Sequence, residues 1–215
     1  LEARAPRRRL VDLTIRDFVE ETASESPAPG GGSVAATLGA LGAALGTMVA
    51  NLSSHKRGWD ERWAHFSEWA DRGKACHDKL LRLIDEDTDA FNRLMTAFGL
   101  PRATPAEKAA RQAAVEAATR EAATVPLRVM EAAVESMSVL DEMAREGLAA
   151  SISDVGVGAL CARGAVQGAF LNVRINCKSF AGNDWAIALL EQGAALMERA
   201  TQLEREILEQ VNARL

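Results

Sequence analysis

One uncharged segment limits the possible folds of this chain more than any other. Residues 26–54 read SPAPGGGSVAATLGALGAALGTMVANLSS and contain no Asp, Glu, Lys or Arg. The two prolines and three consecutive glycines predict a loop, and the Ala- and Gly-rich run that follows predicts a helix over about residues 33–54. Such a segment could be a membrane span, a phosphate-binding loop with its helix, or a close-packed helix beside a ligand site.

The first two interpretations fit the segment poorly. A membrane span needs ~20 mostly apolar residues, and residues 34–52 are long enough but are interrupted by Gly, Thr and Asn. A Walker phosphate loop needs a Lys after its glycines, and none follows here. Gly42 and Gly46 form a GxxxG pair, which lets two helices approach closely. The segment therefore predicts a close-packed helix, and the glycines before it are either a flexible entry loop or a set of backbone N–H donors for a ligand.

The remainder of the chain predicts helices and no strands. Ala, Leu, Glu and Arg, the strong helix formers, are abundant. Thr14, Thr104 and Asn183 stand at expected N-caps, and Pro105 takes the first helical position after Thr104. We expect an all-α, antiparallel bundle of about six helices in one domain, residues 10–215, with residues 1–9 as a linker or tail.

Charge and cysteine usage exclude several classes of protein. The net charge of -5 argues against a general nucleic-acid binder, which would be basic. Cys76, Cys161 and Cys177 are widely spaced and form no CxxC or Cys/His cluster, so neither a disulfide framework nor a zinc site is indicated. Reduced thiols of this kind are typical of the cytoplasm.

An acidic cluster, LIDEDTDAF, contains the first catalytic candidates. Asp87 lies three residues after Ile84 and four before Phe91, so it shares a helix face with apolar side chains. Burial raises the pKa of a carboxyl group toward the range useful for a general acid or base. The alternative, a solvated acidic helix face, stays open for this cluster.

A second stripe of small and polar residues runs through the segment SDVGVGALCARGAVQGAFLNVRINCK. Its members recur every three or four residues: Asp154, Gly158, Cys161, Ala165, Gly168, Asn172 and Asn176. Small residues make room and Asn supplies directed hydrogen bonds, so the stripe predicts either close helix packing or a ligand-lined groove. The cations near these segments could receive an anionic ligand tail or could simply be solvated: His55, Lys56, Arg163, Arg174 and Lys178.

Four motifs in series resemble one known family. SPAPGGGSVAA with GALGAALGTMVANLS, LIDEDTDAF, ATVPLRVMEAA and SDVGVGALCARGAVQGAFLNVRIN occur in that order and are similar to the formiminotetrahydrofolate cyclodeaminases. That family also includes methenyltetrahydrofolate cyclohydrolases, and the likeness covers the chain from Leu10 onward. The resemblance implies an all-helical homodimer, in many organisms fused behind a formiminotransferase domain, and the linker-like residues 1–9 agree with such a fusion.

The resemblance also implies a reaction. Its substrate would be 5-formiminotetrahydrofolate, which cyclises to 5,10-methenyltetrahydrofolate and releases ammonia in histidine degradation and one-carbon metabolism. No metal or redox cofactor would be required, and the small molecule bound would be a tetrahydrofolate derivative, the substrate. Two alternatives stay open: a cyclohydrolase on the same fold, and a non-catalytic folate-binding module in which these residues affect stability and not turnover.

The resemblance assigns expected roles to particular residues. Asp85 and Asp87 match the family's DxD before AF and are expected to supply the acid/base carboxylate, with Asp154 as a further catalytic candidate. Asn172 and Asn176 are expected to bind the pterin ring. Backbone donors of the glycine loop would line the folate pocket: Gly30, Gly31, Gly32 and Ser33. The expected contacts of the glutamate tail are His55, Lys56, Arg163, Arg174 and Lys178.

Overall fold

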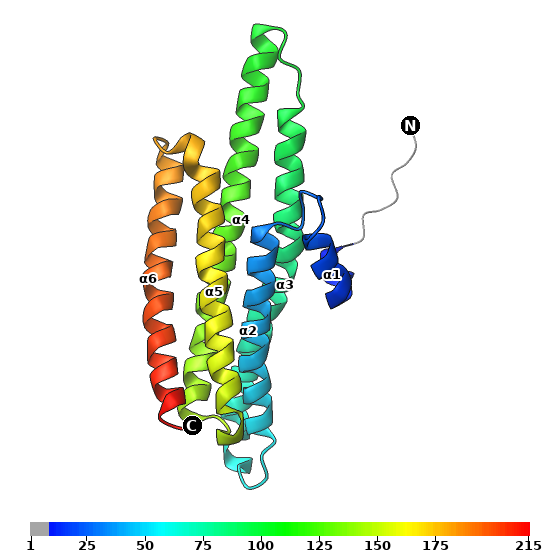
Figure 1. Cartoon of the computed structure of the whole chain (residues 1–215). Coiled ribbons are helices and arrows are strands. Elements are labelled where there is room, and N and C mark those ends of the chain that lie inside the picture. Colours follow the sequence, from blue (N-terminus) through cyan, green and yellow to red (C-terminus); the bar gives the residue numbers. More distant parts are fainter. Residues whose placement is uncertain (1–8) are drawn as a thin grey trace.

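Six α-helices and no strands make up residues 9–215, the part of the chain that the computed structural model describes (Figure 1). The helices are α1 (Ile15–Thr22), α2 (Gly31–Ser54), α3 (Trp63–Phe98), α4 (Pro105–Glu146), α5 (Ile152–Cys177) and α6 (Asp184–Asn212). Short 3-10 turns occupy Leu10–Asp12, Asp60–Arg62, Ala149–Ser151 and Lys178–Phe180. The all-α prediction is therefore confirmed. Of the predicted linker, residues 1–8 lie outside the described residues.

The helix ends follow local sequence signals. Thr14 Oγ1 accepts the backbone N–H of Asp17 at 3.1 Å, and Thr104 forms a reciprocal capping box with Glu107. Asn183 stands at the N-cap of α6 as predicted, but its side chain donates to Glu116 instead of capping the helix. Helix α2 begins at Gly31, two residues earlier than the prediction of Ser33, with Gly30 as an extended N-cap.

The uncharged segment forms a central helix of the bundle. Helix α2 packs against α3, α4 and α5, and its small residues make those contacts close. A Cβ atom added at Gly42 would lie 2.8 Å from the backbone oxygen of Gly158 on α5. The two helix backbones are therefore too close at this point to leave room for a side chain. The predicted close packing through the GxxxG pair is confirmed, since Gly46 likewise meets Leu140 of α4.

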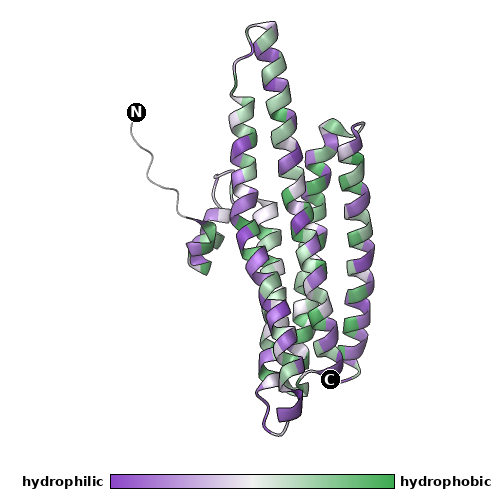
Figure 2. Cartoon of the chain, turned by 180° about the vertical axis from the view of Figure 1, so that it is seen from behind, coloured by the Kyte–Doolittle hydropathy of each residue, from purple (hydrophilic) through white to green (hydrophobic). Residues whose placement is uncertain are grey.

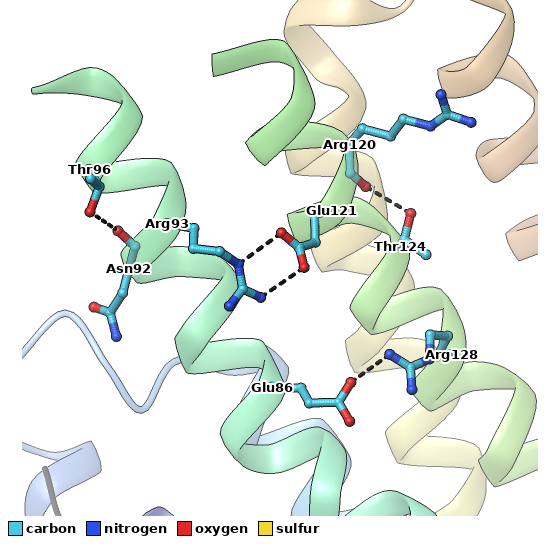
Figure 3. Close-up of polar contacts among 8 residues, drawn as sticks. All are labelled: Glu86, Asn92, Arg93, Thr96, Arg120, Glu121, Thr124 and Arg128. Atoms are coloured by element: carbon cyan, nitrogen blue, oxygen red, sulfur yellow. Dashed lines mark hydrogen bonds and ion pairs between the residues drawn. The ribbon is translucent and has the colours of Figure 1, made fainter. Parts of the chain in front are cut away.

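Helices α3 and α4 continue beyond the other helices as a two-helix arm (Figure 1). They are the longest elements, with 36 and 42 residues against 26 for α5. Two ion pairs join them near the base of the arm (Figure 3): Arg93 with Glu121 at 2.8 Å and Arg128 with Glu86 at 2.5 Å. The arm therefore projects from the end of the bundle where α2 begins and α5 ends.

Two helical stretches of the described chain, Gly31–Ser54 and Ala149–Phe180, are long and apolar enough to cross a membrane by length and composition alone. Their most apolar windows are 61% and 50% buried inside the bundle, so core packing accounts for much of this apolar character. The remainder forms an exposed surface, and apolar and polar stretches alternate along the helices seen from behind (Figure 2). The exposed apolar side chains of these two helices include Leu41, Met48, Leu52, Leu160, Leu171 and Ile175.

Candidate functional site

A cavity of about 210 Å³ lies where the start of α2 meets α3, α4 and the last turns of α5. The glycine loop supplies one wall, and α3 supplies Asp87, Thr88, Phe91 and Leu94. The cavity also contains Ala122 of α4 and both asparagines of the α5 stripe. Residues from motifs far apart in the sequence therefore converge on one hollow at the base of the arm.

Asp87 is the carboxylate of this cavity. The fully buried Ser33 hydroxyl lies 2.9 Å from Asp87 Oδ2 and donates to it, and Ser33 Oγ also lies 3.2 Å from the carbonyl oxygen of Ile84. Burial raises the pKa of Asp87, and the hydroxyl and backbone N–H of Ser33 counteract part of this rise. A carboxyl group with a raised pKa that keeps a hydrogen-bonding partner is suited to exchanging a proton with a ligand.

Gly32 allows this arrangement because it has no side chain. A Cβ atom at this position would lie 2.6 Å from Asp87 Oδ2, inside van der Waals contact. At Gly30 an added Cβ would meet nothing closer than 3.8 Å. Position 32 must therefore be glycine for the Asp87 carboxyl group to keep its place, whereas position 30 has room for a side chain.

Asn172 and Asn176 face the cavity from α5. Asn172 Nδ2 donates to the carbonyl of Gly168 at 3.0 Å, and Asn176 Nδ2 donates to the carbonyl of Ala122 at 2.8 Å. A main-chain carbonyl thus takes one N–H of each amide. The Oδ1 atoms are the groups of these side chains that can accept an N–H of a ligand. The contact to Ala122 also ties the end of α5 to α4.

The cavity combines three kinds of group that a flat, polar heterocycle would use. The first turn of α2 has backbone N–H groups without intrahelical acceptors, at the positive end of the helix dipole. The asparagines supply acceptors, and Asp87 can take or give a proton. The arrangement can therefore bind a nitrogen-rich ring and move a proton on it. No group of three or more His, Cys, Asp or Glu in the described range is arranged to hold a metal ion.

Comparisons with known proteins agree on one family. The profile of the family described as formiminotransferase-cyclodeaminase matches residues 14–205. The chain belongs to the formiminotransferase-cyclodeaminase family.

Individual relatives of this family differ in length and in name. The chain is 35% identical over 202 residues to a methenyltetrahydrofolate cyclohydrolase of Methylorubrum extorquens, covering 94% of this chain and 97% of the relative. It is 33% identical over 209 residues to the formimidoyltransferase-cyclodeaminase of Rattus norvegicus, covering 97% of this chain but 39% of that longer protein. The crystal structure of formiminotetrahydrofolate cyclodeaminase from Thermotoga maritima has the same fold, with a TM-score of 0.83, 24% identity and coverage of 94% and 97% of the two chains.

Asp85, the other carboxylate of the family's DxD, points away from the cavity. Its Oδ1 accepts the backbone N–H of Leu10 at 2.7 Å, and its Oδ2 lies 3.3 Å from Nε of Arg9. It lines a separate hollow of about 420 Å³ between α3 and the segment that carries α1. The structure therefore gives Asp85 the contacts of an anchor for the N-terminal segment, and Arg9, predicted as the last linker residue, takes part in them.

Asp154 and Arg163 lie on α5 away from the cavity. Asp154 is in the first turn of this helix, 18 residues before Asn172, which corresponds to about 27 Å along the axis. Arg163 faces α6, where its Nε lies 3.6 Å from Glu204 Oε2. The middle of the stripe, between Arg163 and Asn172, packs against α2, since Gly168 approaches Ala35 and Ala165 approaches Gly39. Only the last part of the predicted stripe reaches the cavity.

The predicted tail-binding cations are spread over both ends of the bundle. His55 follows the last turn of α2, where its Nδ1 lies 2.9 Å from both Ser54 Oγ and the carbonyl of Asn51. Lys56 lies over the ring of Trp59, 4.1 Å from the centroid. Both are at the opposite end of α2 from the glycine loop, 24 residues or about 36 Å away. Arg174 and Lys178 are exposed near the end of α5 and do not line the cavity.

Two polar groups of the cavity have no place among the predicted site residues. Thr88 Oγ1 lies 3.3 Å from Ser33 Oγ and extends the hydrogen-bonding chain of Asp87. Ala122 contributes its backbone carbonyl and a small side chain to the wall. Thr88 directly follows Asp87 in the acidic motif, and this position could have identified it. Ala122 is one of many alanines on α4, and nothing in the sequence distinguishes it.

Proposed function

We propose that this chain is a formiminotetrahydrofolate cyclodeaminase, which converts 5-formiminotetrahydrofolate to 5,10-methenyltetrahydrofolate and ammonia in the cytoplasm. The observation that carries the proposal is Asp87: a carboxylate with a raised pKa, hydrogen-bonded to the buried Ser33, inside a cavity that also holds acceptors for a pterin. Membership of the family supplies the substrate class, and the cavity supplies groups that the reaction needs.

The proposed reaction requires positioning and one proton relay. The glycine loop and the asparagine Oδ1 atoms hold the pterin so that N10 lies next to the formimino carbon attached to N5. The formimino group reacts as its protonated amidinium, so attack by N10 leaves an amino group on that carbon, and ionised Asp87 takes the proton from N10. Protonated Asp87 then gives it to the amino nitrogen of the cyclic intermediate, the bond from carbon to that nitrogen breaks, and ammonia leaves. The negative charge of Asp87 also stabilises the cationic carbon between N5 and N10.

A second candidate is the methenyltetrahydrofolate cyclohydrolase reaction. It is favoured by the 35% identity to the Methylorubrum extorquens protein of that name over 97% of its length. The same residues would act on a different nucleophile: Asp87 would take a proton from water as the water adds to the methenyl carbon. The ring would then open to 10-formyltetrahydrofolate without release of ammonia.

One assay separates the two reactions. The purified chain is given 5-formiminotetrahydrofolate, and methenyltetrahydrofolate absorbance and ammonia are recorded together. A cyclodeaminase produces both in equal amounts, well above the uncatalysed rate. Consumption of added methenyltetrahydrofolate without cyclodeaminase turnover would replace the first candidate by the second. A folded chain that binds folate and is silent in both assays would refute both and favour the non-catalytic module.

We also propose that the chain acts as a homodimer through the exposed apolar surface of α2 and α5. Leu41 and Met48 of α2 and Leu160 and Leu171 of α5 are exposed on adjacent helices, and contiguous apolar surface of this kind marks interaction sites. Sedimentation of the wild type and of Leu41→Lys should give a dimer and a monomer, respectively. A monomeric wild type would refute the dimer.

A formiminotransferase domain, fused or associated, is a further proposed partner, since the Rattus norvegicus relative carries both names.

A further inference from the structure

The hydroxyl group of Thr88 makes a different contact from those of the other helical threonines. A threonine inside a helix commonly donates its hydroxyl hydrogen to the carbonyl four residues earlier. The other threonines within the helices of the described chain do so, as Thr47 and Thr96 show. Thr88 Oγ1 instead lies 3.3 Å from Ser33 Oγ. Its hydroxyl group therefore joins α3 to the first turn of α2 beside the candidate cavity.

Ser33 Oγ is the meeting point of several oxygen atoms. Asp87 Oδ2 lies 2.9 Å from it, the carbonyl oxygen of Ile84 3.2 Å and Thr88 Oγ1 3.3 Å. The Ile84 carbonyl is the group four residues before Thr88, the acceptor that a helical threonine commonly uses. Because a hydroxyl group has one hydrogen, the acceptors around Ser33 compete for it.

The charge of Asp87 decides which neighbour receives the Ser33 hydrogen. Asp87 Oδ2 is the nearest of the three oxygens, and a hydrogen bond to a charged acceptor is roughly twice as strong as one between neutral groups. The Ser33 hydrogen therefore goes to Asp87 while this carboxyl group is ionised. Thr88 can then form a hydrogen bond with Ser33 only as the donor. A hydroxyl group that accepts a hydrogen bond becomes a stronger donor itself.

We propose that Thr88 is a positioning residue of the candidate site: its hydroxyl group donates to Ser33 Oγ and thereby strengthens the hydrogen bond from Ser33 to ionised Asp87. This role rests on the proposed function, in which ionised Asp87 takes a proton from N10. Thr88 acts through Ser33 and does not touch the reacting atoms. Loss of its hydroxyl group leaves the Ser33 hydrogen to be shared more evenly between Asp87 and the Ile84 carbonyl.

The charged groups around Asp87 stay the same when Thr88 or Ser33 is changed. Burial and the hydrogen bonds from Ser33 are the causes of the shifted pKa of Asp87. Helix α2 has no charged residue, and α5 turns two neutral asparagines to the cavity. The two ion pairs of Figure 3 join α3 to α4. The other charged side chains line the hollow beside α1, of which Thr88 is also a wall residue: Arg9, Asp17, Glu21, Asp85 and Asp89.

The test is an NMR titration of the Asp87 carboxyl group, in protein with isotope-labelled aspartate and with the signal assigned by its loss in Asp87→Asn. Thr88→Val replaces the hydroxyl group by a methyl group, and Thr88→Ser keeps it. Thr96→Val is the matched control on the same helix, because the Thr96 hydroxyl group donates to the carbonyl of Asn92 (Figure 3). We expect the midpoint to move to higher pH in Thr88→Val, less far than in Ser33→Ala, and to stay in place in the other two variants.

A double variant separates an effect through Ser33 from a direct effect. Valine also makes the surroundings of Asp87 more apolar, which by itself raises the pKa of a carboxyl group. That effect persists when Ser33 is replaced by alanine, whereas an effect through the Ser33 hydroxyl group does not. Thr88→Val should therefore shift the midpoint in the wild-type background and not in the Ser33→Ala background. An equal shift in both backgrounds, or no shift in either, overturns the positioning role.

Kinetics show whether the proposed reaction uses this contact. In Thr88→Val the acid limb of kcat/KM should move to higher pH together with the NMR midpoint, and kcat at high pH should change less. A raised KM with the acid limb in place would make Thr88 a substrate contact, since it also lines the cavity, and would overturn the proposal. A chain without turnover refutes the proposed function, and the NMR titration still decides whether Thr88 acts on Asp87 through Ser33.

Discussion

The two ends of helix α2 differ in what their polar groups face. At the first end, Ser33 and Asp87 are held against each other beside a cavity that opens toward Asn172. At the other end, the His55 ring is engaged by Ser54 and Asn51 of its own helix, and Lys56 covers Trp59. Both ends of α2 carry polar residues. Only at the first end do these residues line one cavity together with a buried carboxylate. The candidate site is therefore distinguished by polar residues of several helices that meet in one cavity, and not by the presence of polar residues alone.

The largest effect should follow from Asp87→Asn. Asparagine can still accept from Ser33 but cannot take a proton from N10, so turnover should fall by about 10²- to 10⁴-fold. Rates of methenyltetrahydrofolate formation over a range of substrate concentrations measure this loss. Asp85→Asn is the matched control, since an amide oxygen can keep the contact with Leu10, and its turnover should stay within about twofold of the wild type. Equal losses in the two variants would contradict the separation of their roles.

The same substitution should also stabilise the fold at neutral pH. The pKa of Asp87 is raised in the folded chain by burial, so its contribution to stability is fully present below the unfolded pKa and is lost as pH rises through the folded pKa. The uncharged amide of the Asp87→Asn variant would avoid this loss. Denaturant unfolding should therefore give a higher free energy of unfolding for the variant at neutral pH, and the two proteins should converge as the pH is lowered through the pKa of Asp87. A variant less stable than the wild type at neutral pH would count against a destabilising buried carboxylate.

A smaller but still clear effect should follow from Gly32→Ala. The added methyl group would overlap the Asp87 carboxyl group, so either the carboxyl group moves or the start of α2 shifts. We expect a loss of about 1–3 kcal/mol of stability, the typical cost of inserting a methyl group into a packed site, together with reduced kcat. Gly30→Ala, with free space around its Cβ, should change neither. Thermal unfolding and kcat are measured for both variants. Losses in Gly32→Ala alone mean that the space beside the carboxylate matters, whereas equal losses in both variants mean that the loop needs the flexibility of glycine.

Ser33→Ala should change the pH dependence more than the maximal rate. The Ser33 hydroxyl lowers the pKa of Asp87, opposing the effect of burial. Its removal should raise that pKa further, and because the ionised carboxylate starts the reaction, the acid limb of kcat/KM should move to higher pH. A purely structural serine would lower the rate at every pH and leave the midpoint in place. Ser33→Thr, which keeps the hydroxyl, should restore the position of the limb to the extent that it folds.

The sequence predicted the fold better than the composition of the site, for reasons that particular residues show. A capping residue such as Thr104 acts over a few residues, and the GxxxG pair of Gly42 and Gly46 acts through the small size of its side chains, so both signals can be read from the chain. The partner of Gly42, Gly158 on α5, could not be read in this way. The α5 stripe correctly contained Asn172 and Asn176, but periodicity cannot say how far along a helix a site extends, so Asp154 shared the pattern while lying about 27 Å away. The DxD motif likewise could not reveal that two carboxylates two residues apart face different neighbours. That difference depends on the N-terminal segment, which reaches Asp85 from 75 positions away in the chain.

The smallest effects should come from the other end of the bundle, and they test the comparison most directly. His55→Ala removes a group about 36 Å along α2 from the glycine loop, and Asp154→Asn removes one about 27 Å along α5 from Asn172. Within one chain neither can touch a folate bound at Asp87, so kcat and KM should stay within about twofold of the wild type. A large loss of kcat in His55→Ala, with the fold and the dimer intact, would require a second chain to bring its own His55 to the cavity. Mixing His55→Ala with Asp87→Asn chains then gives a sharp answer: activity recovered in mixed dimers means a shared site, and no recovery means that each cavity works alone.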